Sequence, residues 1–123
     1  MNEDDVRVVV VDDVADAAEA LAAALELSGY KVWIAGDGAE ALALIDEHRP
    51  HCVLLDIGMP GMDGFELTRQ LRERYQDDIV LIAVTGREAD DERVSKTFAR
   101  VDHYLQKPVD PDDLKKLLPP LNG

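Results

Sequence analysis

Polar residues that could carry out chemistry follow short apolar segments at four separate places in the chain. They are Asp12 and Asp13, Asp56, Thr85 and Lys107. An aspartate can attack phosphorus and form an acyl phosphate. A divalent cation and a lysine ammonium would neutralise the phosphoryl oxygens, which is most of what phosphoryl transfer requires. If the fold gathers these residues, they predict a magnesium-dependent phosphoryl acceptor.

The three aspartates also restrict the choice of metal. Neighbouring carboxylates repel one another, and a bound divalent cation relieves that repulsion. Oxygen-only ligands favour Mg²⁺ or Ca²⁺ over zinc, and the three histidines, at positions 48, 51 and 103, are scattered. There is no EF-hand spacing, so we expect Mg²⁺ that keeps several of its waters.

Apolar segments of two kinds alternate with helical patterns. The segments 6–12, 51–56 and 79–85 are almost continuously apolar and rich in valine and isoleucine. Such runs are typical of parallel strands that are covered on both faces. The segments 30–35 and 102–107 are shorter and more mixed, and we predict edge strands there.

Helical patterns lie between these segments. In the first helix, Val14, Ala18, Leu21, Ala22 and Leu25 form one apolar stripe. Capping residues mark the starts of three others, with Asp37 and Glu40, Asp63 and Glu66, and Asp110 before Pro111. The predicted helices cover 14–28, 38–48, a stretch that starts at Asp63 and has Arg69, Arg72 and Arg74 at its end, about 88–100, and the stretch from Pro111 to the Pro119-Pro120 pair.

Strands that alternate with helices predict an α/β fold, a doubly wound five-stranded parallel sheet of flavodoxin-like (βα)5 architecture. Such a sheet commonly has the order 2-1-3-4-5 and binds ligands outside the carboxyl ends of strands 1 and 3. The aspartates fall at those two ends. Lys107, on a strand roughly 10 Å from strand 3, has the length to reach Asp56, whereas Thr85, one strand away, needs only a hydroxyl.

Length and charge restrict the function further. The 123 residues fit a single domain, 1–123, with a core of about 6–118. A net charge of −13 argues against direct binding of nucleic acid, because phosphate binding needs a basic surface. No apolar run approaches the length of a membrane span and the start is acidic, so we expect no membrane association and a cytoplasmic location. Cys52 is the only cysteine, and we expect it to be buried as a small apolar residue.

Four motifs give the chain a family resemblance. The stretches "VVVDD" (9–13), "LLDIGMPGMDGFEL" (54–67), "VTG" (84–86) and "YLQKP" (104–108) resemble the receiver domain of two-component response regulators. The resemblance covers nearly the whole chain, from residue 6 to about residue 118. It implies a signalling module rather than an enzyme, with a histidine kinase or a histidine phosphotransfer protein as its partner. The downstream protein is not implied.

The resemblance also implies roles for individual residues. Asp56 would accept the phosphoryl group from a phosphohistidine. Asp12, Asp13, Asp56 and the backbone carbonyl of Gly58 would hold Mg²⁺, and Lys107 would pair with the phosphoryl group.

Further implied roles concern the response to phosphorylation. Thr85 would move toward the new phosphate and Tyr104 would change rotamer with it. These movements would alter the surface of the fourth helix, the fifth strand and the fifth helix. Pro108 would follow a cis peptide bond.

Three alternatives remain open from the sequence. The chain resembles, more weakly, a receiver domain cut from a hybrid histidine kinase. An Asp-nucleophile phosphohydrolase would use similar chemistry, although it usually carries a second acid two residues after the nucleophile, where this chain has Gly58. A flavodoxin-like cofactor binder would need a phosphate-binding loop after the first strand, where this chain has "DDVADA".

Overall fold

The computed structural model describes residues 6–56, 64–76, 78–85, 101–106 and 109–118. The predicted helix at 88–100 lies outside these residues. The described elements alternate along the chain as β1 (Arg7–Val11), α1 (Ala15–Leu27), β2 (Lys31–Ala35), α2 (Gly38–His48), β3 (Cys52–Asp56), α3 (Gly64–Tyr75), β4 (Val80–Thr85), β5 (His103–Gln106) and α5 (Pro111–Lys115).

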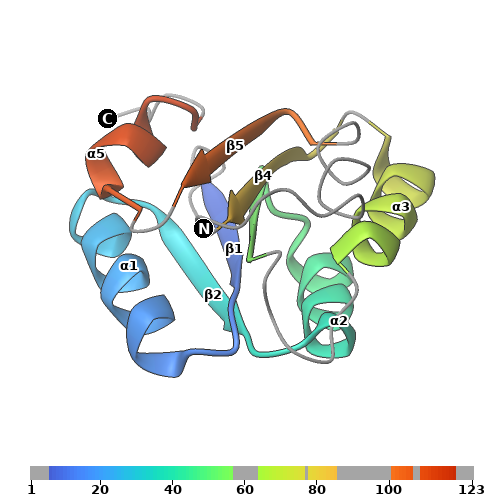
Figure 1. Ribbon diagram of the computed structural model, residues 1–123, viewed down its shortest axis with the longest axis horizontal. Helices are drawn as coiled ribbons and strands as arrows, with labels where there is room; N and C mark the ends of the chain where they lie inside the picture. The colour runs from blue at the N-terminus through green and yellow to red at the C-terminus, as the bar shows by residue number, and fades with distance from the viewer. Residues whose placement is uncertain (1–5, 57–63, 77, 86–100, 107–108, 119–123) are drawn as a thin grey trace.

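The five strands form one parallel sheet in the order β2-β1-β3-β4-β5, which confirms the predicted topology. Figure 1 shows α1 and α5 on one side of the sheet and α2 and α3 on the other. In the register of the central strands, Val11 lies beside Leu55 and Asp56 lies beside Val84. The residues that end these strands therefore meet at one edge of the sheet.

The valine run of β1 explains how the sheet holds two helical layers. Val9 and Val11 pack into the core on the side of α2 and α3, whereas Val8 and Val10 pack into the core on the side of α1 and α5. All four side chains are buried. Because successive side chains of a strand point to opposite faces, a central strand needs an apolar residue at every position.

The predicted helix caps are present where the structure describes them. The side chain of Asp37 accepts a hydrogen bond from the Glu40 N–H (2.7 Å), and Asp110 does the same for the N–H of Asp112 (2.9 Å). The Glu40 carboxylate accepts from Gly36 N–H (3.1 Å), one residue earlier than a capping box requires. Each of these helices thus starts at the residue that the sequence indicates.

Two predicted helix boundaries differ from the structure. Val14 belongs to the predicted stripe of the first helix, but it precedes α1 and its side chain is 52% exposed. The fifth helix ends at Lys115 rather than at the proline pair. After Lys115, the N–H groups of Leu117 and Leu118 donate to the carbonyls three residues earlier. This is the hydrogen-bond pattern of a 3₁₀ turn rather than of an α-helix.

Two further predictions concern the burial of Cys52 and the presence of a helix that could span a membrane. Cys52 is fully buried, as expected, and burial raises the pKa of its thiol, with Asp102 adding to the effect. Trp33 is partly buried, and its ring stacks on that of His48 at 4.0 Å. None of the described helices has the length and apolar character that crossing a membrane requires.

A side-chain clip formed by Arg72 and Asp102 joins α3, β4 and β5 at the amino edge of the sheet. The Arg72 guanidinium donates to the carbonyls of Gln76 (2.7 Å) and Ile79 (3.0 Å) and to Asp102 Oδ2 (2.7 Å). The same carboxylate oxygen accepts the N–H of Leu81 (2.8 Å). Partial burial alone would raise the pKa of Asp102, but these hydrogen bonds and the arginine charge outweigh it and lower the pKa.

We expect Arg72→Ala to destabilise the fold by about 1–3 kcal/mol, because it removes the guanidinium donor from two carbonyls and from the Asp102 carboxylate, which keeps its hydrogen bond from the Leu81 N–H. Urea unfolding measures this change. Arg69→Ala is the matched control, since among the described residues the ion-pair partners of Arg69 are Glu66 and Glu73 of its own helix. Equal losses in both variants would show that the clip adds nothing beyond a surface ion pair.

His51 closes the first step of the β1–β3 ladder with its side chain. The imidazole Nδ1 of His51 accepts a hydrogen bond from the backbone N–H of Arg7 (3.0 Å). The backbone N–H of His51 donates to the Arg7 carbonyl (2.9 Å). A nitrogen that accepts a hydrogen bond carries no proton, so the fold needs the neutral imidazole. Burial, and next the charge of Arg7, lower the pKa of His51.

A lowered histidine pKa makes stability depend on pH. Above about pH 6.5 His51 is neutral in both states, and below it the unfolded chain takes up a proton more readily than the folded one. Stability should therefore fall as pH falls from about 6.5 toward the folded-state pKa. His51→Asn keeps an acceptor that does not titrate, so urea midpoints at pH 7.5 and 5.5 should differ less in this variant. An unchanged difference would contradict the role of His51.

Candidate functional site

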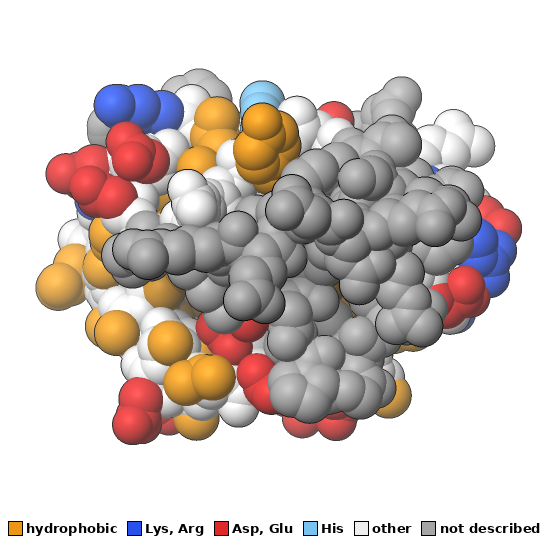
Figure 2. Space-filling model, viewed as in Figure 1, with side chains coloured by type: hydrophobic (Ala, Val, Ile, Leu, Met, Phe, Trp, Pro, Cys, Tyr) orange, Lys and Arg blue, Asp and Glu red, His pale blue; other side chains and the backbone are white. Residues whose placement is uncertain are grey.

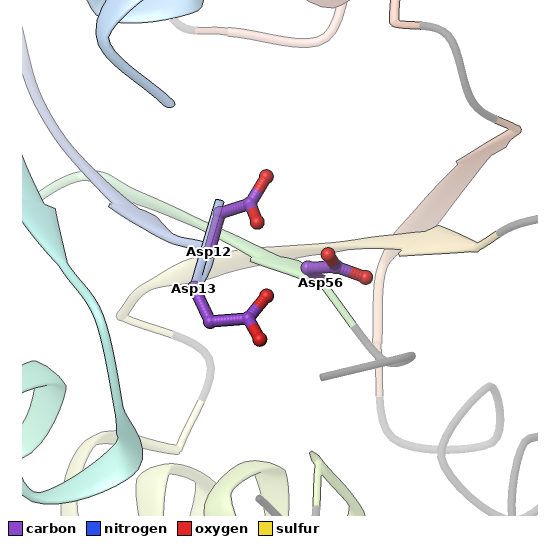
Figure 3. A group of neighbouring side chains, drawn as sticks. All are labelled: Asp12, Asp13 and Asp56. Atoms are coloured by element: carbon purple, nitrogen blue, oxygen red, sulfur yellow. The ribbon is translucent and has the colours of Figure 1, made fainter. Parts of the chain in front are cut away.

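Three aspartates meet at the carboxyl edge of the sheet. Asp12 and Asp13 follow β1, and Asp56 is the last residue of the neighbouring β3. One carboxylate oxygen from each lies within 4.8 Å of the others. Figure 3 shows the side chains of Asp12 and Asp13 extending toward Asp56 from the end of β1. The structure thus brings together three acids that are far apart in the sequence.

The three acids differ in their exposure to solvent. Asp56 is only 4% exposed, Asp12 is intermediate and Asp13 is exposed. Asp56 lies deep because every residue of β3 is buried between the two helical layers. A reacting group from solution can approach from the side of Asp13, while the strand holds Asp56 in a fixed position.

Local hydrogen bonds fix the backbone that carries Asp12. Its N–H donates to the carbonyl of Ala35 at the end of β2 (2.9 Å), which extends the parallel pairing by one residue. Its Oδ1 accepts the N–H of Val14 (2.9 Å). This short turn holds the carboxylate close to the backbone, leaves α1 to begin at Ala15, and gives Asp12 a role other than capping the helix.

The donor set fits a hard divalent cation. The contributed atoms are carboxylate oxygens, and the described residues hold no other group of His, Cys, Asp and Glu of this kind. Opposite ligands of octahedral Mg²⁺ lie about 4.2 Å apart, given metal–oxygen distances of about 2.1 Å. The upper spacing of 4.8 Å needs only a small side-chain adjustment to reach that value.

The other predicted site residues are only partly described. Thr85 is the last residue of β4, next to Val84 and paired in register with Gln106 of β5. Tyr104 lies on β5 with 64% of its side chain exposed. Three further predictions fall outside the described residues: the roles of Gly58, Lys107 and Pro108.

An apolar cleft of about 680 Å³ opens beside the aspartates. Asp12 and Asp56 line one end of it, and the ends of β1, β3 and β4 form its floor. Its walls come from α1 and from the segment that enters α5, with Val14 and Pro111 among them. This cleft was not predicted from the sequence. The sequence feature that could have indicated it is the side of the first helix that is rich in alanine and carries few charged residues.

Comparison with known proteins gives consistent results. Residues 8–119 match the family model described as the response regulator receiver domain. Among curated proteins, the chain is 44% identical over 109 residues to "Response regulator MprA" of Mycobacterium sp. (strain KMS) and 42% identical to the protein of that name in Mycobacterium tuberculosis (strain ATCC 25177 / H37Ra). Each match covers 89% of this chain but 47% of the relative, so the chain spans about half the length of these relatives.

Solved structures also resemble this chain over most of its length. The response regulator receiver domain protein (CheY-like) from Methanospirillum hungatei JF-1 has a TM-score of 0.83 and 33% identity, with 92% of this chain and 90% of that chain covered. The signal receiver domain from Bermanella marisrubri has a TM-score of 0.80 and 30% identity, with 90% and 92% covered.

Proposed function

The chain belongs to the response regulator receiver domain family, and from this membership we propose that Asp56 is its phosphoacceptor. The observation that supports the assignment best is the meeting of Asp12, Asp13 and Asp56, with Asp56 the most buried of the three. A receiver domain is the signalling module of a two-component system. We propose that residues 1–123 form one such domain and act on no separate substrate.

In the proposed step, a carboxylate oxygen of Asp56 attacks the phosphorus of a phosphohistidine on a partner protein. The new O–P bond forms an acyl phosphate, and the P–N bond breaks with its electron pair going to the imidazole nitrogen. Lys107 would pair with the transferred group. Asp56 suits the nucleophile's role because its strand fixes its position and burial excludes much of the competing water.

We propose Mg²⁺ as the cofactor, held by the carboxylates of Asp12, Asp13 and Asp56 and the backbone carbonyl of Gly58. When bound, the ion supplies positive charge against the oxygens of the phosphoryl group. Asp12 keeps its carboxylate in place through the hydrogen bond from Val14 N–H (2.9 Å).

The proposed output is a change of surface. Phosphorylation replaces the single negative charge of the Asp56 carboxylate with a phosphoryl group that carries about 1.5 to 2 negative charges. The Thr85 hydroxyl would move toward this charge and Tyr104 would change rotamer, altering the face formed by the fourth helix, β5 and α5. We also propose a cis peptide bond before Pro108.

The proposed partner is a histidine kinase or a histidine phosphotransfer protein. We propose a cytoplasmic location for the domain, where such a partner would meet it. A receiver domain excised from a hybrid histidine kinase would carry out the same step at Asp56. The partner's identity would then differ while the chemistry of the site stays the same.

Acetyl phosphate tests the proposal without a partner. In the presence of Mg²⁺, intact mass spectrometry should show one added phosphoryl group, and chelation with EDTA should prevent it. Borohydride reduces an acyl phosphate of aspartate to homoserine, so peptide mapping would assign the position. Absence of an adduct, with turnover of p-nitrophenyl phosphate instead, would favour a phosphohydrolase and overturn the proposal.

A further inference from the structure

The strand β5 has little apolar packing of its own to hold it in place. Of its four residues, His103–Gln106, three are exposed, and Leu105 is partly buried against the core on the side of α1 and α5. In Figure 2 hydrophobic side chains reach the surface near the top of the view, over β5 and α5. By contrast, every residue of β3 is buried. Apolar packing therefore fixes the position of β5 along β4 only weakly.

Asp102 makes both hydrogen bonds of the first step of the β4–β5 ladder. Its N–H donates to the Leu81 carbonyl (2.8 Å), and its side-chain Oδ2 accepts the Leu81 N–H (2.8 Å). In a regular parallel ladder that N–H donates to a backbone carbonyl, so the carboxylate takes the carbonyl's place. The pairs that follow run in register to the end of β5. Asp102 therefore defines the residue at which β5 joins the sheet.

Arg72 holds the Asp102 carboxylate from the side of α3. Its guanidinium donates to the same Oδ2 (2.7 Å) and to the carbonyls of Gln76 and Ile79, which follow α3 and precede β4. The Arg72 side chain is only 17% exposed, so solvent screens this ion pair less than a fully exposed one. A shift of β5 by one residue would move Asp102 about 3.3 Å along β4 and break its contacts with Arg72 and Leu81.

The register of β5 decides on which face of the sheet Tyr104 lies. In the observed register Tyr104 pairs with Ala83, and Thr85 lies two positions further along β4. Residues of a strand alternate between the two faces, so a slip of one residue would move Tyr104 to the face where Leu105 now packs. The position of Tyr104 relative to Thr85 therefore depends on the contacts of Asp102.

We propose that Asp102 and Arg72 are positioning residues, which fix the register of β5 and so place Tyr104 to respond when Asp56 is phosphorylated. The inference deepens the proposed function and rests on it for the phosphorylation of Asp56 and for the response of Tyr104. The register itself does not rest on it, because the contacts of the clip are present without a phosphoryl group.

The test follows the full chain by NMR, with ¹³C in the tyrosine rings and ¹⁵N in the amides. Asp102→Ala removes the side-chain acceptor of the Leu81 N–H, whereas Asp102→Asn keeps an oxygen that can accept it. Asp46→Ala is the matched control. It removes an ion pair of the same length, with Arg74 (2.7 Å), and the acceptor of the Tyr75 hydroxyl, and both of these contacts join α2 to α3 away from β5.

Labelling of the wild type with acetyl phosphate and Mg²⁺ should shift the ring signals of Tyr104. Among samples with equal adduct by intact mass, we expect this shift to fall by at least about half in Asp102→Ala, and to fall in Arg72→Ala as well. It should stay near the wild-type value in Asp102→Asn and in Asp46→Ala. Before labelling, the Leu81 amide hydrogen should exchange at least about tenfold faster in Asp102→Ala than in the wild type.

An unchanged Tyr104 shift in Asp102→Ala would overturn the inference. An equal loss in Asp46→Ala would also overturn it, because the effect would then belong to general destabilisation. Absence of an adduct on the wild type would instead mean that the proposed function fails. The register is then still measured without phosphate, by nuclear Overhauser contacts between the backbone protons of Tyr104 and Ala83. Full persistence of these contacts in Asp102→Ala would show that Asp102 does not set the register.

Discussion

Asp56→Asn should abolish the phosphoryl adduct that acetyl phosphate and Mg²⁺ form on the wild-type protein. Asparagine has nearly the shape of aspartate, so the end of β3 keeps its packing, but a neutral amide lacks the charged oxygen that attacks phosphorus. We expect no adduct by intact mass spectrometry at times when the wild type is labelled. Circular dichroism should show the same fold in both proteins.

The matched control is Asp78→Asn, which makes the same chemical change at an exposed acid near the opposite edge of the sheet. This variant should be labelled at the wild-type rate. A persistent adduct on Asp56→Asn would place the phosphoryl group on another residue and contradict the assignment. Loss of labelling in both variants would show that overall charge, not the position of Asp56, controls the reaction.

Asp13→Asn should weaken Mg²⁺ binding on the order of a hundredfold. Losing a group that only supports a metal ligand already costs about tenfold to a hundredfold, and Asp13 would be a ligand itself. One charge fewer among three close carboxylates also weakens the attraction for any divalent cation. Isothermal titration with Mg²⁺ at fixed ionic strength measures the change, and adduct formation should slow with it.

Asp16→Asn controls for general charge, because Asp16 is an exposed acid only three residues further along the chain. It should change Mg²⁺ affinity little, since salt screens an exposed charge that is not a ligand. Similar weakening in the two variants would show that Mg²⁺ senses the net charge of this edge of the sheet. That result would remove Asp13 from the proposed metal site.

The strands could be predicted because short runs of sequence indicate them, and the strand order could be predicted because parallel sheets of this kind share a common topology. Four consecutive valines in β1 exclude a strand that faces water on either side, and parallel strands then require helices on both faces. Topology follows from the common order for such sheets, and it places Asp12 beside Asp56 without any knowledge of side chains. Helix caps such as Asp37 could also be predicted, because the side chain binds a backbone N–H only three residues further along the chain.

Features that depend on side-chain competition or on distant contacts could not be predicted. Val14 matches the helical period, but the carboxylate of Asp12 takes its N–H and α1 begins one residue later. The contact between Arg72 and Asp102 joins residues 30 positions apart, and no local pattern marks it. The apolar cleft beside the aspartates depends on the distance between α1 and α5, which the packing of both helices on the sheet decides.

The burial of β3 determines which parts of the domain unfold locally and which unfold only with the whole fold. Proteins unfold locally in units whose opening free energies range from almost zero to the full stability of the fold. A central strand with every residue buried belongs to the most protected unit, whereas α5 is a five-residue helix at the side of the sheet. Amide hydrogens around Asp56 should therefore exchange only by global unfolding. The proposed acceptor would keep its geometry while the helix beside it frays, so a partner could remodel that side of the domain without dismantling the chemistry.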